Sequence, residues 1–346
     1  MAIARIRFLV PGTSSRFRCG GLSVEVQTAR LLAGLRPTEL VTYRERSPDH
    51  LFLEDCLQHE AVDPSVLWVV SWGFDVPALI RRLRGHRTVY HAHSSGYGFS
   101  LPAGVPVLAV SRNTLGYWGN RAPRNPLLLV SNALDGQWLR RGDRHGTAGR
   151  PIDVLVQARK SSPYVQQQLV PALREAGLTV QVQAGWVDDL VDLFNRSSVY
   201  LYDSAEYWRG RGVTEGFGLP PLEALACGCV VFSSLNHALA DHGVPGRTLH
   251  QIGCGRLGFD LERIAAAVRT PLQWRPAADQ LDLLLDRCSE ANLLDGWREA
   301  LQQLDAMEAV SGPDLVSPST WQLRLDQGIQ RLRRVVDRFP GWLNGT

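Results

Sequence analysis

Short apolar, β-branched runs alternate along this chain with segments of helical length, and this alternation constrains the fold more than any other feature. It is typical of parallel strands joined by crossover helices, so it predicts an α/β fold with doubly wound sheets. In the first half we expect strands at Arg5–Val10, Leu40–Tyr43, Val66–Ser71, Thr88–His91, Val105–Val110 and Leu127–Val130. In the second half we expect them at Ile152–Val156, Val180–Val182, Val199–Tyr202, Val230–Ser233 and Thr248–Ile252.

The length predicts two domains, because 346 residues exceed the ~250 to 300 at which single cores stop growing. A polar, Gly-rich stretch without periodicity, residues 135–150, marks the boundary between them. We therefore expect Rossmann-like domains at 1–148 and 149–316, and a C-terminal helix at 317–346 that packs back toward the first domain. Two such sheets face each other across an interdomain cleft, and open α/β sheets bind ligands at the carboxyl ends of their strands.

Charge and hydropathy exclude several classes of protein. The net charge is +3, and residues 1–150 carry 19 basic and 11 acidic side chains, or +8. The basic runs are short, so we expect no nucleic-acid partner. The excess of basic residues is compatible with a peripheral contact with an anionic membrane, and the alternative is a basic surface that faces only solvent.

No apolar run approaches the ~18 residues of a membrane span, and the first residues lack a signal-peptide pattern. Six cysteines without framework spacing indicate reduced thiols, and we expect a cytoplasmic protein, able to lie peripherally at the inner face of a membrane.

The most informative segment runs from Thr214 to Gly228. Its glycines, Gly216 and Gly218, permit close backbone approach, and the prolines that follow suit a helix start, so a loop feeds a helix N-terminus here. Such a terminus binds anions, a diphosphate included. Glu223, expected in the first turn, and Glu215, eight residues earlier, would flank that anion and accept hydrogen bonds from sugar hydroxyls. The alternative is structural, with Glu215 in a loop hydrogen bond and Glu223 favouring the helix dipole.

This run, Glu-Gly-Phe-Gly-Leu-Pro-Pro-Leu-Glu-Ala-Leu-Ala-Cys-Gly from residue 215 to 228, resembles the Glu-x7-Glu signature of retaining glycosyltransferases with the GT-B fold, of the family-4 type. The resemblance implies an acceptor-side domain at 1–148 and a nucleotide-sugar-binding domain at 149–316. It implies that Glu223 holds the nucleotide ribose and that Glu215 holds hydroxyls of the donor sugar. The backbone of four residues would meet sugar and diphosphate: Gly216, Phe217, Gly218 and Leu219.

Two other segments are similar to functional positions of this family. Arg159 and Lys160 follow the first strand of the second domain, where the family has a basic pair that neutralises the diphosphate. The match is incomplete, because Ala158 precedes the pair and Tyr164 stands near the position of the family's lysine. Gly20 and Gly21 stand where the family has a glycine-rich donor-binding loop, although a Gly-Gly pair also suits a plain turn.

Two histidines, His91 and His93, lie near the carboxyl end of the Thr88–His91 strand. The family has a histidine here, close to the anomeric centre of the donor sugar. Alternation along a strand puts both side chains on one face, so the choice between them stays open, with preference for His93. A metal-binding pair is the competing interpretation, but the sequence offers no third ligand, and we expect no metal.

The resemblance implies transfer of a sugar from a nucleotide diphosphate to an acceptor hydroxyl with retention of the anomeric configuration, without metal and with no cofactor besides the sugar nucleotide. The acceptor would be a sugar or a lipid-linked molecule, in glycan, glycolipid or polysaccharide biosynthesis.

A dehydrogenase is disfavoured, because the loop after the first strand, residues 12–17, lacks Gly-x-Gly-x-x-Gly. A pyridoxal-phosphate phosphorylase would need a lysine, and Lys160 is the one lysine of the chain. The remaining alternative is a catalytically silent GT-B paralogue that binds a sugar nucleotide or a glycan. The aromatic and basic segment at 206–213 could shape the donor pocket, bind an acidic acceptor or form an exposed loop.

Overall fold

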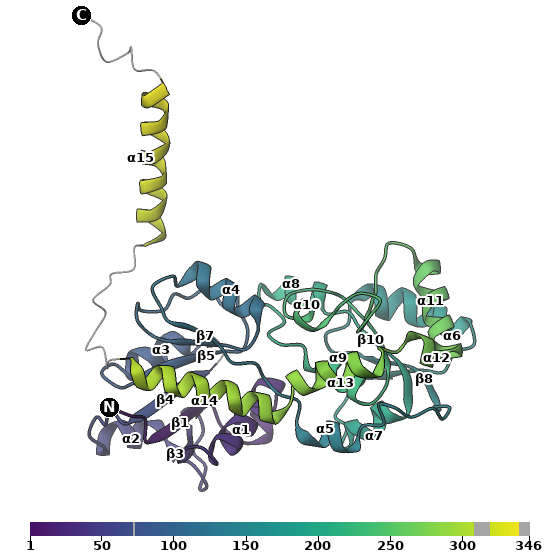
Figure 1. The fold of residues 1–346 in the computed structure, drawn as a ribbon, viewed down its shortest axis with the longest axis horizontal. Helices are drawn as coiled ribbons and strands as arrows, with labels where there is room; N and C mark the ends of the chain where they lie inside the picture. Colours follow the sequence, from purple (N-terminus) through teal and green to yellow (C-terminus); the bar gives the residue numbers. More distant parts are fainter. Residues whose placement is uncertain (72, 308–318, 339–346) are drawn as a thin grey trace, which may run out of the picture.

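The computed structural model describes residues 1–71, 73–307 and 319–338. They form two α/β domains, each with a wholly parallel sheet (Figure 1). The first sheet has the order β3-β2-β1-β4-β5-β6-β7 and the second the order β12-β11-β10-β8-β9. The predicted fold class is therefore confirmed.

The strands agree closely with the expected runs. Those of the first sheet are β1 Arg5–Val10, β2 Thr38–Thr42, β3 Leu51–Phe52, β4 Val66–Ser71, β5 Thr88–Ala92, β6 Val107–Ala109 and β7 Leu127–Leu129. Those of the second are β8 Ile152–Gln157, β9 Val180–Gln183, β10 Ser197–Tyr202, β11 Val230–Ser233 and β12 His250–Gln251. The sequence does not predict β3, because this edge strand has two residues and its Leu51 is exposed.

The helices lie between and after the strands. In the first half they are α1 Gly20–Leu32, α2 Leu53–His59, α3 Val76–Arg82, α4 Arg112–Arg121 and α5 Gly136–Arg141. In the second half they are α6 Val170–Glu175, α7 Leu190–Asn195, α8 Ala205–Arg211, α9 Leu219–Ala226, α10 Leu239–His242, α11 Leu257–Arg269, α12 Pro271–Trp274, α13 Ala278–Arg287, α14 Glu290–Ala306 and α15 Thr320–Arg338.

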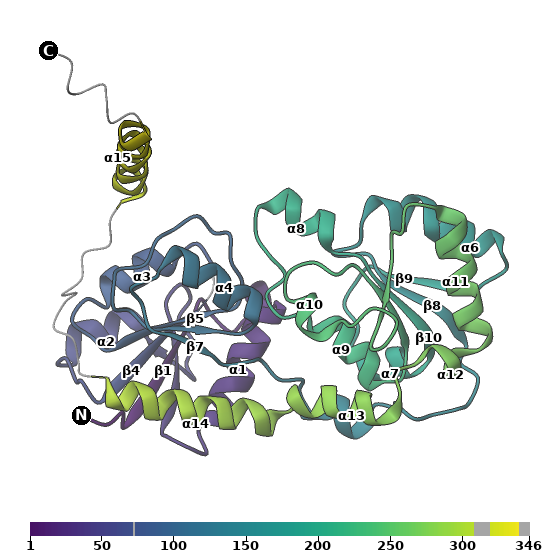
Figure 2. The same cartoon turned by 45° about the horizontal axis from the view of Figure 1, so that its top comes forward.

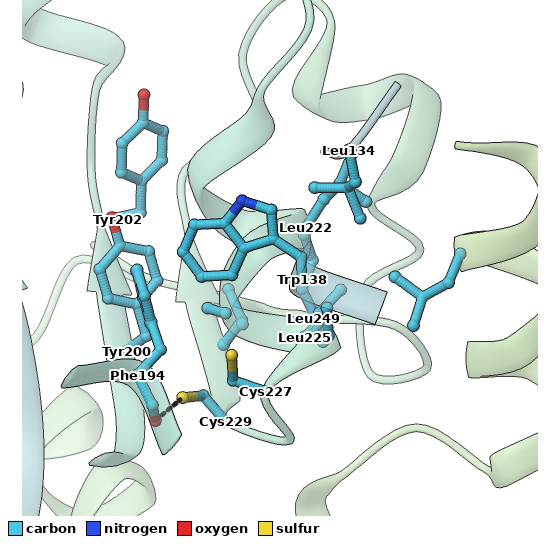
Figure 3. Close-up of a cluster of buried hydrophobic side chains, with 14 of the residues drawn as sticks. Leu134, Trp138, Phe194, Tyr200, Tyr202, Leu222, Leu225, Cys227, Cys229 and Leu249 are labelled. Atoms are coloured by element: carbon cyan, nitrogen blue, oxygen red, sulfur yellow. Dashed lines mark hydrogen bonds between the residues drawn. The ribbon is translucent and has the colours of Figure 1, made fainter. Parts of the chain in front are cut away.

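The core of the second domain includes a helix that the sequence assigns to the first. Trp138 of α5 is buried beside Phe194 of α7, with ring centroids 5.6 Å apart (Figure 3). The same cluster contains Leu222 and Leu225 of α9. Residues 136–141 therefore pack with the second domain, which differs from the predicted limit at 148/149. The stretch 135–150 that suggested this limit itself contains α5.

A second crossing returns the chain to the first domain. Leu293, Trp297, Ala300, Leu301 and Leu304 recur at helical spacing on α14, and this buried stripe packs with Ile3, Ile6 and Phe8. Figure 2 shows α14 leaving α13 and running along the first domain. The helix that packs back is therefore α14, which the predicted limits placed in the second domain. Residues 320–332 of α15 are exposed, and the predicted limit at 316/317 lies outside the described residues.

The chain crosses between the domains before α5 and again before α14, and these two crossings lie side by side. The Leu134 amide donates to the Cys288 carbonyl at 2.8 Å. Glu290 at the start of α14 accepts hydrogen bonds from Gln27 and Arg30 of α1 and from the Gly136 amide. The two connections between the domains are therefore joined to each other by hydrogen bonds.

We predict that Trp297→Ala destabilises the protein by about 3 to 5 kcal/mol, because truncation removes a large, fully buried ring between α14 and β1. Urea unfolding followed by circular dichroism measures the effect. Glu299→Ala, an exposed position on the same helix, is the control and should change stability by less than about 0.5 kcal/mol. Equal stabilities for the two variants would contradict the packing of α14.

Candidate functional site

Two loops, one from each domain, are interlocked at the carboxyl ends of the sheets. The Ser95 amide donates to Thr214 Oγ1 at 3.0 Å, and the Thr214 amide donates to the Ser95 carbonyl at 3.1 Å. A Cβ on Gly216 would lie 1.4 Å from the carbonyl oxygen of His93, so a side chain there would force the backbones apart. The segment that begins with Glu215 therefore lies directly against the first domain.

Glu215 is buried, and three side chains surround its carboxylate. Tyr202 Oη and Trp208 Nε1 donate to Oε2 at 2.5 and 2.7 Å. Lys160 Nζ lies 3.4 Å from Oε1 and 3.5 Å from Oε2. Burial, with the nearby Glu215 charge, raises the pKa of Tyr202 well above its usual value, so the phenol remains a donor. Within the described part of the chain, Oε1 has the single long contact with Lys160 and so retains capacity to accept a hydrogen bond.

The predicted basic pair is divided in the structure. Lys160 has a φ of +67°, a left-handed conformation that is uncommon for a residue with a side chain. Its ammonium lies 4.7 Å from the centre of the Trp208 ring, as well as beside Glu215. Arg159 is exposed and makes no hydrogen bond or ion pair with any residue that the structure describes. Lys160, not Arg159, therefore lies next to the carboxylate.

The predicted anion-binding terminus is the start of α9. Gly218 is the residue before the helix and has a φ of +93°, which glycine adopts without strain. The helix begins at Leu219, and the two prolines that follow have no N–H. Fewer amides are therefore available than the sequence suggested, chiefly those of Gly218 and Leu219. Phe217 is buried, and its carbonyl lies 3.0 Å from His242 Nε2.

Glu223 is the fifth residue of α9 and lies in the second turn, not in the first turn as expected. Its side chain is half-buried and makes no hydrogen bond with the residues described here. Burial raises its pKa to about 7, although the positive charge of Lys160 opposes this shift. Near neutral pH the carboxyl group is therefore close to equally divided between its two protonation states.

Gly20 and Gly21 are helical, whereas the resemblance implied a glycine-rich loop at this position and a plain turn was the alternative. They form the first turn of α1, which begins at Gly20 with Cys19 as its N-cap. The preceding residue, Arg18, places its guanidinium 5.2 Å from the centre of the Trp186 ring, which belongs to the loop after β9. The N-terminus of α1 thus also lies next to the second domain.

His91 and His93 share a buried carboxylate that the sequence did not identify. Glu25 Oε1 lies 2.8 Å from His91 Nδ1 and 2.5 Å from His93 Nε2. Burial alone would raise the pKa of Glu25, but the charges and hydrogen bonds of the imidazoles lower it well below its ordinary value. His91 is buried against Trp297, whereas the carbonyl of His93 contacts Gly216. Of the two histidines, His93 is therefore the one at the contact between the domains.

The same cluster contains the third ligand that the sequence did not reveal. One ligand atom each from Glu25, His91 and His93 lies within 4.8 Å of the other two. Two imidazoles and a carboxylate are ligands that suit Zn²⁺ and related ions. The distances of 2.5 to 2.8 Å to Oε1 are those of hydrogen bonds.

Four residues of the candidate site were absent from the sequence-based site predictions. They are Tyr202, Trp208 and His237, which contact Glu215, and Glu25, which contacts the two histidines. Tyr202 ends a predicted strand, and Trp208 lies in the aromatic segment at 206–213, which is α8 and contacts Glu215. His237 Nδ1 accepts a hydrogen bond from the Glu215 amide at 3.2 Å. Glu25 had one signal, since a carboxylate on a helix face of buried residues needs a partner.

Solved structures with the GT-B glycosyltransferase fold resemble this chain. A glycosyltransferase from Rickettsia africae has a TM-score of 0.63 and 13% identity, covering 87% of this chain and 98% of its own. Sucrose-phosphate synthase from Thermosynechococcus elongatus has a TM-score of 0.62 and 13% identity, covering 87% and 99%. Anabaena Alr3699/HepE, solved in complex with UDP and glucose, has a TM-score of 0.57 and 15% identity, covering 87% and 100%. At such identities the likeness establishes the fold alone. No protein-family model and no curated protein sequence matches the chain.

We predict that Glu223→Gln becomes increasingly stabilising relative to the wild type between about pH 4.5 and 7. The raised pKa means that the folded protein resists ionisation of Glu223 over this range, so the wild type loses stability that a neutral glutamine keeps. The difference should reach roughly 1 to 3 kcal/mol and level off above pH 7. Urea unfolding at several pH values measures it, and a difference that does not vary with pH would contradict the burial of this carboxyl group.

Glu25→Gln should show the opposite pH dependence. The pKa of Glu25 is depressed, so its ionised form contributes stability above the ordinary carboxyl range and loses it as the pH falls. The variant should therefore be less stable than the wild type by roughly 2 kcal/mol at pH 7 and by less at pH 2, below the ordinary carboxyl range. A cost that is as great at pH 2 as at pH 7 would rule out the lowered pKa of Glu25.

Proposed function

We propose that this chain is a retaining glycosyltransferase of the family-4 type that transfers a sugar from a nucleoside diphosphate to an acceptor hydroxyl. One observation carries the proposal. Glu215 and Glu223 lie eight residues apart on either side of the N-terminus of α9, and Gly216 holds this segment against the opposite domain. The GT-B fold supports it, and the complexes of the Anabaena protein with UDP and UDP-glucose make UDP the first nucleotide to test.

The residues around α9 have chemistry suited to each part of a sugar nucleotide. Glu223, when ionised, would accept hydrogen bonds from the ribose diol, and Glu215 Oε1 would accept them from a hydroxyl of the donor sugar. The amides of Gly218 and Leu219, with the adjoining Gly216 and Phe217 backbone, would meet the sugar and the diphosphate. These amides lie at the positive end of the helix dipole.

The first domain would complete the donor site. His93 lies where its loop contacts Gly216, close to the expected anomeric centre. Gly20 and Gly21 would offer first-turn amides of α1 to the diphosphate or the acceptor. Lys160, and Arg159 after reorientation, would supply positive charge to the departing phosphate.

Transfer with retention would proceed on one face of the sugar. The bond between the anomeric carbon and the diphosphate oxygen breaks, the acceptor oxygen bonds to the anomeric carbon on the same face, and the leaving phosphate accepts the proton of that hydroxyl. Lys160 and the α9 amides stabilise the charge that develops on the diphosphate. Contact between the domains excludes water, which would otherwise hydrolyse the donor. Neither a metal ion nor a further cofactor takes part in this scheme.

The acceptor in this proposal is a sugar or a lipid-linked molecule of glycan, glycolipid or polysaccharide biosynthesis. The protein would act in the cytoplasm, with peripheral contact at the inner face of an anionic membrane. The basic excess of the first 150 residues supports such contact.

A catalytically silent GT-B paralogue is the second candidate, and one observation favours it. Lys160 is engaged by Glu215 while Arg159 faces solvent, so the basic pair is not assembled around a diphosphate position. A silent paralogue would bind nucleoside diphosphates without turning over any sugar nucleotide.

We predict that Glu215→Gln lowers sugar transfer on the order of 100-fold, because a hydrogen bond to a charged group contributes about 2 to 3 kcal/mol. Affinity for the nucleoside diphosphate alone, measured by calorimetry with UDP first, should change by less than about threefold, since Glu215 is assigned to the sugar. Transfer is measured as nucleotide release from a panel of sugar nucleotides.

Glu206→Gln is the matched control, because Glu206 is exposed on the adjacent α8. It should retain wild-type transfer, and chelation by EDTA should leave wild-type transfer unchanged. Equal transfer by both glutamine variants would refute the role of Glu215. Loss on chelation would favour a metal held by Glu25, His91 and His93, and nucleotide binding without any transfer would favour the silent paralogue.

A further inference from the structure

The C-terminal helix α15 has no partner among the residues that the structure describes. Every position from Thr320 to Leu332 is exposed, including large apolar side chains. Figure 1 shows the helix standing apart from both domains. Most of the stability of a helix in a protein comes from packing of its apolar face, and the interior Gly328 weakens this helix further. A surface outside the described chain is therefore needed to stabilise it.

The exposed part of α15 is strongly amphipathic. Trp321, Leu325, Ile329 and Leu332 are 70%, 48%, 40% and 67% exposed. At 100° per residue they fall within a sector of about 80°, on one face of the helix. Leu323, 47% exposed, lies outside this sector. The four residues form an apolar stripe, and we refer to them by that name.

The charge of α15 complements an anionic surface. Its sequence contains five arginines, at positions 324, 331, 333, 334 and 338, against two aspartates, at 326 and 337, for a net charge of +3. An apolar face, arginines on the polar side and a tryptophan are the features of helices that lie in the membrane interface. A second copy of α15 would instead bring one positively charged helix against another. No helix among the described residues, α15 included, is long and apolar enough to cross a bilayer.

We propose that α15 binds in the interface of an anionic membrane, with the apolar stripe among the acyl chains and with Arg324 and Arg331 at the headgroups. This adds α15 to the basic first 150 residues as an element of the membrane contact in the proposed function, and it rests on that function only for its purpose, access to a lipid-linked acceptor. Binding itself requires no transfer, so the two can fail separately.

The test is flotation of the full-length protein with two kinds of vesicle. One consists of equal parts phosphatidylglycerol and phosphatidylcholine, and the other of phosphatidylcholine alone. We expect binding to the anionic vesicles that is on the order of 100-fold tighter, since three net charges contribute about fivefold each near such a surface. High salt should weaken this binding.

Two double variants separate the apolar stripe from general charge. L325D/I329D places two acids in the stripe, whereas Q327D/Q330D adds the same charge on the polar face. We expect the first to bind anionic vesicles at least tenfold more weakly than the second. Equal binding by both variants would overturn the proposal, as would tight binding to phosphatidylcholine alone. Self-association of the wild type without vesicles, abolished by L325D/I329D, would assign the stripe to a second copy of the chain and overturn it too.

Nucleotide binding and transfer to a water-soluble acceptor, measured on the same proteins, keep the two proposals distinct. L325D/I329D should match the wild type in both assays, because α15 lies outside the donor site. Reduced UDP affinity in this variant would count against a separate membrane element. Vesicle binding without transfer in the wild type would leave α15 as a membrane helix and refute the glycosyltransferase assignment.

Discussion

The close approach of Gly216 to the carbonyl of His93 is the contact on which the arrangement of the candidate site depends. A single methyl group at residue 216 would occupy the space of that oxygen, so the two domains can meet here only through glycine. The reciprocal hydrogen bonds between Ser95 and Thr214 hold the same loops in register. They place Glu215 at the boundary between the domains while keeping it buried.

Three carboxylates near this boundary have three different electrostatic environments. Glu25 is compensated by two imidazoles, Glu215 by a lysine with two neutral donors, and Glu223 by the positive charge of Lys160 without a hydrogen bond to the described residues. The pKa of Glu25 is accordingly depressed, and that of Glu223 is raised. A ligand that donates hydrogen bonds to Glu223 would favour its ionised form, so binding there is coupled to proton release.

Local pattern in the sequence was sufficient for the strands other than β3, the two-sheet fold and the position of Glu215 before a helix start. These features depend on alternation, periodicity and residues close together in the chain. The domain with which α5 or α14 packs was not predictable in this way, because the residues that cover each buried helix face are far away in the sequence. The φ of Lys160 and the burial of Glu25 likewise arise from tertiary contacts. The prolines after Leu219 are evident in the sequence. That they remove amide donors from the first turn of the helix becomes clear only once the start of α9 is known.

The paired crossings near Leu134 and Glu290 have a mechanical consequence. Two adjacent connections joined by the hydrogen bond from Leu134 to Cys288 define an axis, and rotation about that axis would leave them intact. The bonds between Ser95 and Thr214 lie elsewhere on the boundary and would break in such a rotation. Separation of the two domains by this rotation would then break a few hydrogen bonds at one edge of the boundary, while α14 moves together with the first domain.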